Sequence, residues 1–210
     1  MTPEQILKFW FADAAENVQA GQKRYKFWFE ATPETDQQIH DQFSDVYSQA
    51  RTGALETWQT APRSCLALII ALDQFPRNLF RGTPEAFATD RQAQQMCQDG
   101  LRQHYLSELN CAEQLFFLMP LQHAEDLALQ EESLRLSETA LAQAPIDWHE
   151  FLNSSLGSTR KHLELIRRFG RFPHRNIVLG RESTPEEQAF LDSGSGSFGQ
   201  APAAGSRHSG

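Results

Sequence analysis

The tripeptide Thr-Pro-Glu occurs four times in this 210-residue chain, at Thr2, Thr32, Thr83 and Thr184. Each occurrence predicts the start of a helix. A threonine hydroxyl accepts from unpaired backbone N–H groups, proline suits the first helical position, and an early glutamate suits the helix dipole. At Thr2 and Thr184 a Gln or Glu three residues later completes a capping box. The four positions are unevenly spaced, so helix starts recur without a sequence repeat.

Strand signals are nearly absent, because the chain has no sustained alternation of apolar and polar residues and no Asn-Gly hairpin turn. The nearly all-apolar stretch 65–72 is rich in Ala and Leu and follows Ala61-Pro62, which favours a central buried helix over a buried strand. The sequence therefore predicts an all-α fold. The expected helices are 3–15, 33–52, 62–75, 84–99, 111–118, 121–143, 147–169 and 185–192.

Length and composition favour one packed domain over residues 1–192. The chain is 40% hydrophobic and 10% aromatic, which is normal for a globular protein and argues against general disorder. Residues 193–210 (SGSGSFGQAPAAGSRHSG) are small and polar, so we expect a disordered Gly/Ser/Ala-rich tail there.

The formal net charge of −8 argues against a non-specific nucleic-acid binder and against a binder of anionic membranes. No apolar run approaches the length of a membrane span, and the first residues lack the pattern of a signal peptide. The three cysteines, Cys65, Cys97 and Cys111, show no Cys-x-x-Cys spacing and fit reduced thiols. We therefore expect a cytoplasmic protein; the oligomeric state is not predicted.

Two segments share a pattern: DQFPRNLFRGTPEAFATD at 73–90 and GRFPHRNIVLGRESTPEEQAFLD at 170–192. In both, Phe-Pro is expected to end one helix and Thr-Pro-Glu to start the next. Asp73 shares a face of the preceding helix with apolar residues, so burial requires a cationic or multi-donor partner. Arg77 and Arg81 are the nearest candidates. They form either an internal clamp or a site in which the carboxylate orients an arginine toward a ligand.

The second segment lies in a basic region. Residues 160–182 contain seven Lys or Arg and two acids, a local reversal of sign in an acidic chain. Part of this excess complements a helix C-terminus. The functional interpretation is a pocket for a carboxylate or phosphate group, since guanidinium groups bind these groups bidentately. The candidate ligand-binding residues of the two segments are Arg77, Asn78, Arg81, Arg171, His174 and Arg175.

A third polar group lies at 119–132, MPLQHAEDLALQEE. His123 and Asp126, three residues apart, are candidates for a pair of metal ligands or an acid–base pair, with Asp73 as a further catalytic candidate. The alternative is that acidic residues here only suit the dipole of the following helix. A metal site needs a third ligand that cannot be placed from the sequence, so we predict no metal and no cofactor. Trp28, before the Thr32 helix start, is a candidate for lining a cleft.

These segments together resemble the bacterial family Domain of Unknown Function 924. The resemblance runs from residue 5 to residue 192 and rests on ILKFWF, ALDQFPRNLFRGTPEAFATD, LMPLQHAEDLALQEES and RRFGRFPHRNIVLGRESTPEEQAFL. It implies a tetratricopeptide-like fold, with antiparallel helix pairs stacked in a right-handed array, and it implies no reaction. Where the family's middle motif has a serine, this chain has Ala124, which argues against a mechanism requiring that hydroxyl.

Three functions fit these observations. The first is a binding protein whose arginine-rich cleft takes a small anionic molecule or a peptide carboxylate. The second is a hydrolase or lyase acting on a small anionic substrate with His/Asp acid–base residues. The third is a structural or protein-interaction scaffold whose charges only pair internally. Convergence of the candidate residues on one cleft would favour the first two.

Overall fold

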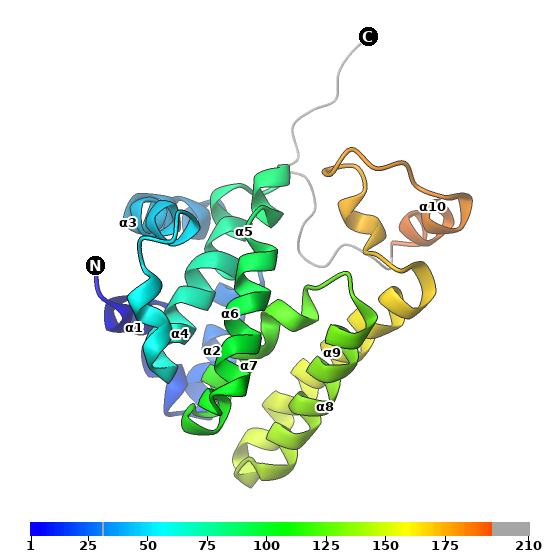
Figure 1. Cartoon of the computed structure of the whole chain (residues 1–210). Helices are drawn as coiled ribbons and strands as arrows, with labels where there is room; N and C mark the ends of the chain where they lie inside the picture. The colour runs from blue at the N-terminus through cyan, green and yellow to red at the C-terminus, as the bar shows by residue number, and fades with distance from the viewer. Residues whose placement is uncertain (31, 195–210) are drawn as a thin grey trace.

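The computed structural model describes residues 1–30 and 32–194. This part of the chain is a single all-α domain without strands (Figure 1), which confirms the predicted fold class. The finer expectation of a tetratricopeptide-like array remains a prediction. Of the predicted tail, Ser193 and Gly194 form a turn after the last helix, and residues 195–210 lie outside the described residues.

The α-helices are α1 (Pro3–Phe11), α2 (Val18–Phe29), α3 (Pro33–Arg51), α4 (Pro62–Ile69), α5 (Phe75–Leu79), α6 (Asp90–Arg102), α7 (Cys111–Gln122), α8 (Leu127–Gln143), α9 (His149–Phe169) and α10 (Pro185–Asp192). Between them lie the short 3₁₀ turns η1 (Ala12–Ala15), η2 (Glu56–Thr60), η4 (Pro84–Phe87), η5 (Tyr105–Glu108), η6 (Ile146–Trp148) and η7 (Pro173–Arg175). A π-helical turn, η3 (Ile70–Gln74), joins α4 to α5.

Three of the four predicted helix starts are confirmed. Thr2, Thr32 and Thr184 each cap a helix, and the predicted capping boxes at Thr2 and Thr184 are present. Thr83 is the exception, since its hydroxyl donates to the carbonyl of Phe80 and the next segment is the single turn η4. The predicted helix 84–99 is therefore wrong at its start, and α6 begins at Asp90.

The core is built around α4 and η3. All residues from Cys65 to Leu72 are at most 3% exposed, which confirms the predicted buried central helix. Helices α1, α6 and α7 contact α4, and α7, α8 and α9 pack in succession against one another. Helix α2 is absent from the predicted helices. Its start is capped by Asn17, and it brings Trp28 onto Phe11 and Phe116 in the core.

The predicted end of the central helix at residue 75 is wrong, because the helical chain continues through Pro76 to Leu79. Proline provides no N–H for the carbonyl four residues earlier, which is that of Leu72. The hydroxyl of Thr89 donates to this carbonyl at 2.6 Å. The π-helical turn and the threonine together let Pro76 sit inside a helix, which places Asp73 and Arg77 on one buried stretch.

The chain between α7 and α8 also differs from expectation. The predicted helix 111–118 extends to Gln122, with Pro120 inside it, and the predicted helix 121–143 begins only at Leu127. His123 and Asp126 therefore lie in the connection and not on one helix face. The Gln130 amide donates to the carbonyls of Gln122 and Ala124, which fixes this connection against the start of α8.

Candidate functional site

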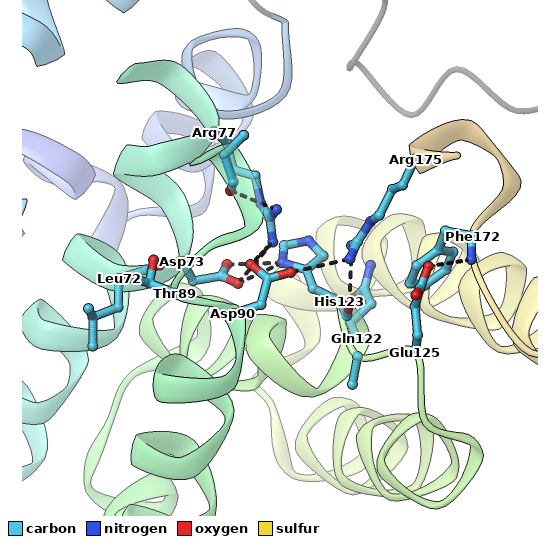
Figure 2. Close-up of polar contacts among 12 residues, drawn as sticks. Leu72, Asp73, Arg77, Thr89, Asp90, Gln122, His123, Glu125, Phe172 and Arg175 are labelled. Atoms are coloured by element: carbon cyan, nitrogen blue, oxygen red, sulfur yellow. Dashed lines mark hydrogen bonds and ion pairs between the residues drawn. The ribbon is translucent and has the colours of Figure 1, made fainter. Parts of the chain in front are cut away.

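Arginines of the two Phe-Pro segments meet at Asp90, the first residue of α6 (Figure 2). Arg77 Nη2 lies 2.7 Å from Asp90 Oδ1, and Arg175 Nη1 lies 3.2 Å from Asp90 Oδ2. Both guanidinium groups also stack near the ring of Phe87, at 4.8 and 4.7 Å from its centre. Two segments about a hundred residues apart thus converge on one carboxylate and one aromatic ring.

Asp73 lies beside this pair and is fully buried. Its carboxylate faces His123 Nδ1 at 2.9 and 3.0 Å, accepts from the Gln74 amide at 2.5 Å, and lies 3.5 Å from Arg77 Nη2. Burial alone would raise the pKa of Asp73, but the charge and hydrogen bond of His123, with Arg77 and Gln74, lower it to about 2. The carboxylate is therefore ionised and can only accept.

This fixes the orientation of His123. Because ionised Asp73 accepts only, Nδ1 of His123 donates to it. The carbonyl of the same histidine accepts from Arg175 Nη2 at 3.1 Å, so the second segment holds its backbone. No described residue hydrogen-bonds to Nε2, and His123 lines a cleft. The second ring nitrogen is thus available to a bound molecule.

The two arginines differ in how fully their charge is balanced. Burial lowers the pKa of Arg77, but Asp90 and Asp73 outweigh this and raise it. Burial and then repulsion by Arg77 lower the pKa of Arg175 to about 10, although Asp90 and Glu125 act in the opposite direction. The buried Nε of Arg175 has no hydrogen-bond partner among the described residues. Arg175 is therefore the less compensated cation.

Two further histidines surround this end of the site. His162 on α9 lies with its ring centre 6.2 Å from that of His123, and its Nδ1 is 2.8 Å from the carbonyl of Ser158. Burial lowers the pKa of His162 to about 3, and burial with repulsion by Arg175 lowers that of His174 to about 3. Both are neutral at pH 7, so they add polar ring atoms without adding charge.

The cleft has a volume of about 280 Å³. Most of the predicted ligand-binding residues line it: Trp28, Arg77, Asn78, Arg81, His174 and Arg175, together with His123. Asp73 lies behind His123, in contact with its ring. The two arginine-bearing segments therefore meet in space at this cleft.

Asn78 and Arg81 reach the cleft while they bind Asp36 on α3. Arg81 donates to both carboxylate oxygens of Asp36 at 2.8 Å, and the Asn78 amide donates to one of them at 2.8 Å. Asp36 thereby fixes the wall formed by α5. A ligand would meet these two side chains in a set position.

Two predicted site residues lie away from the cleft lining. Arg171 pairs bidentately with Glu187 of α10, at 2.7 and 2.8 Å, and donates to the carbonyl of Glu182. Asp126 caps α8 by accepting from the Leu129 N–H at 3.0 Å. His123 takes Asp73, and not Asp126, as its carboxylate partner.

Several residues that shape the site were not predicted. Asp90 joins the two arginines, and the only available sequence signal was its position at the end of the first quoted segment. Glu125 accepts from the Phe172 N–H at 2.8 Å and pairs with Arg181, which secures the second segment next to the α7–α8 connection. These partners are distant in sequence, so no local spacing identifies them.

Across residues 1–30 and 32–194, no group of three or more His, Cys, Asp or Glu side chains is placed to hold an ion. The same part of the chain has no helix long and apolar enough to cross a membrane. The chemistry that the arrangement offers is a pair of guanidinium groups and a carboxylate-oriented imidazole at the wall of a cleft.

The chain belongs to the bacterial family of unknown function DUF924, whose profile matches residues 6–195. A similar solved structure is that of a protein of unknown function, ATU0120, from Agrobacterium tumefaciens. It is 34% identical, with a TM-score of 0.76 over 91% of this chain and 97% of that one. The comparison with curated proteins gives no match. The relatives therefore support the all-α fold and the family, and carry no statement about activity.

Proposed function

We propose that the cleft binds a small anionic ligand through a carboxylate or phosphate group. The observation that carries this proposal is the convergence of Arg77 and Arg175 on Asp90 beside His123. Guanidinium groups bind carboxylate and phosphate through paired hydrogen bonds.

Arg175 supplies the main attraction for an anion. Its Nε lacks a partner among the described residues, and its lowered pKa reflects incomplete compensation of a buried charge. An anion at the cleft would offset the repulsion between the two arginines. The imidazole of His123, oriented by Asp73, adds a further polar group at the same end of the cleft.

A thermal-shift and calorimetric screen with phosphate, sulfate, acetate and succinate tests the proposal. A ligand at 100 times its dissociation constant should stabilise the protein by about 2.7 kcal/mol. Arg175→Met should abolish this stabilisation. Arg171→Met is the matched control, because Arg171 belongs to the same segment but pairs with Glu187 away from the cleft.

The structural alternative makes the opposite prediction. If the charges serve only to pair internally, Arg175→Met should lower stability while no anion raises the stability of the unaltered protein. Unchanged anion binding in Arg175→Met would likewise contradict the proposed site.

A second candidate function is acid–base catalysis on an anionic substrate, of the hydrolase or lyase type. It is favoured by the Asp73–His123 pair, in which the carboxylate orients an imidazole that lines the cleft. The arginines would hold the substrate anion, and Nε2 would accept or supply a proton. In a screen of anionic esters, amides and hydroxy acids, His123→Gln should abolish any turnover while the variant remains folded. Turnover that survives in His123→Gln would exclude this role.

A further inference from the structure

We propose that the ligand is amphipathic, with its anionic group at the arginine end and an extended apolar or aromatic body along α7 and α9. This inference rests on the proposed anion site and names the class of ligand that the remaining cleft surface would take. It comes from the order in which side chains line the cleft along these two helices.

Helix α9 presents a graded face to the cleft. Phe151 comes first, Ser154, Ser155 and Ser158 follow, and His162 comes last. These positions recur at helical spacing, so they lie on one face. With a rise of about 1.5 Å per residue, the face extends about 16 Å from Phe151 to His162. The helix thus passes from an aromatic end, through hydroxyl groups, to the histidine end.

Helix α7 has the same gradient in the same direction. Leu115 and Met119 line the cleft before Gln122 and His123. The rise of about 1.5 Å per residue places His123 about 12 Å beyond Leu115. The rings of His123 and His162 lie 6.2 Å apart, so the polar ends of the two helices coincide.

The aromatic ends also coincide, because α2 joins them. Trp28 lies with its ring centre 4.9 Å from that of Phe116 on α7 and 6.3 Å from that of Phe151 on α9. The Trp28 Nε1 donates to the carbonyl of Trp10 at 2.9 Å, so its polar atom is already used and an apolar ring surface remains. Tyr25, also on the lining, is a large side chain that is 43% exposed.

The arginines of the lining belong to the two Phe-Pro segments, whereas the lining at the end of α2 carries the acidic side chain of Glu30 and no arginine among the described residues. Arg175 donates to the carbonyl of His123, and Arg77 contacts Asp73, the partner of the same histidine. A small inorganic anion would use only this end. An apolar body attached to the anion would cover Leu115, Met119 and the aromatic rings of α2, and would be stabilised by removal of apolar surface from water.

Isothermal titration calorimetry with acetate, butanoate, hexanoate and octanoate tests whether the cleft has an anion-binding end and an apolar end. Affinity should increase about fourfold for each methylene buried. Octanamide, the neutral analogue, should bind at least tenfold more weakly than octanoate. Octyl phosphate, measured alongside octanoate, identifies the preferred anionic group, and tight binding of either supports the inference.

Two variants locate the apolar body. Ser155→Phe should fill the middle of the cleft and weaken octanoate at least tenfold, while acetate binding stays within twofold. Tyr25→Ser should weaken octanoate severalfold. Ile177→Ser is the matched control, because Ile177 is 84% exposed and does not line the cleft.

The outcomes separate the inference from the proposed function. If acetate or phosphate binds through Arg175 but octanoate binds no more tightly, the amphipathic ligand is excluded and the anion site stands. If octanoate and octanamide bind equally and Arg175→Met changes neither, the anion site is wrong, and the inference fails with it. If no compound binds, both are overturned.

Discussion

The two Phe-Pro segments have similar sequences and different backbones. In the first, Phe75-Pro76-Arg77-Asn78 continues a helix through a π-helical turn. In the second, α9 ends before Gly170, which has a left-handed φ of 69°, and Pro173 begins a short 3₁₀ turn. Both nevertheless direct an arginine to Asp90. The shared motif therefore places an arginine at Asp90 in both segments. The backbone conformation of each segment depends on the residues around the motif.

The later arginines continue the parallel. Arg81 pairs bidentately with Asp36, and Arg181 pairs bidentately with Glu125. Arg81 and Arg181 thus tie the two segments to a different helix or connection each, while Arg77 and Arg175 line the cleft. The segments differ most in the balance of charge, since Arg77 forms ion pairs with both Asp73 and Asp90, whereas Arg175 pairs only with Asp90 among the described residues.

The largest expected effect comes from removing the better-compensated arginine. Arg77→Met leaves Asp73 and Asp90 buried with less positive charge, so the free energy of unfolding should fall by about 3–5 kcal/mol. Arg175→Met should cost about 1–3 kcal/mol, because Asp90 keeps Arg77. Urea denaturation of both variants measures the difference. An equal or larger cost for Arg175→Met would contradict the assigned imbalance.

The next largest expected effect is on the pH dependence of stability, to which Asp73 of the first segment and His174 of the second contribute in different pH ranges. The pKa of Asp73 is lowered from 3.8 to about 2 in the folded state. It therefore contributes about 2 kcal/mol of stability that is present above pH 4 and is lost as the pH falls toward 2.

The pKa of His174 is instead lowered from 6.5 to about 3, so the unfolded chain takes up the proton first. His174 should lower stability by up to about 1.4 kcal/mol per pH unit, beginning near pH 6.5, and His162, with a similarly lowered pKa, should add a similar fall. Denaturation at a series of pH values should show Asp73→Asn flattening the lower part of the profile and His174→Asn the upper part. If neither variant alters the profile, other groups govern it.

A smaller loss of stability is expected from removing the hydroxyl group that supports the helical backbone of the first segment around Pro76. Thr89→Val removes the hydroxyl that satisfies the Leu72 carbonyl, and we expect a loss of about 1–2 kcal/mol. Thr83→Val is the matched control, since Thr83 donates within an exposed turn and should cost less than about 0.5 kcal/mol. Similar costs in the two valine variants would show that the helix tolerates Pro76 without this donor.

The smallest effect is expected outside the cleft. Arg168→Ala breaks an ion pair with Glu186 in which both side chains are at least half exposed, so stability should change by less than about 0.5 kcal/mol. Anion binding should be unchanged. Thermal denaturation at low and high salt measures the change in stability. A large loss of stability that does not depend on salt would show that this ion pair contributes more than an exposed pair does.

Much of the fold follows from local sequence signals. The caps at Thr2, Thr32 and Thr184 depend on residues at most three positions away, and all three form. The apolar run from residue 65 to 72 is stabilised by removal of its surface from water, so its burial was predictable, and it is buried. Thr83 shows where the local signal fails, because a hydroxyl has alternative acceptors within the same turn.

The sequence by itself also determined that Asp73, on an apolar face, needs donors. It did not determine which ones. His123 lies 50 positions away, and the Arg175–Asp90 contact joins residues 85 positions apart. Such contacts arise only when α6, the α7–α8 connection and η7 pack together. Helix starts are fixed by neighbouring residues, whereas the cleft and its charge balance were decided by tertiary packing, because buried charges must find partners wherever the folded chain places them.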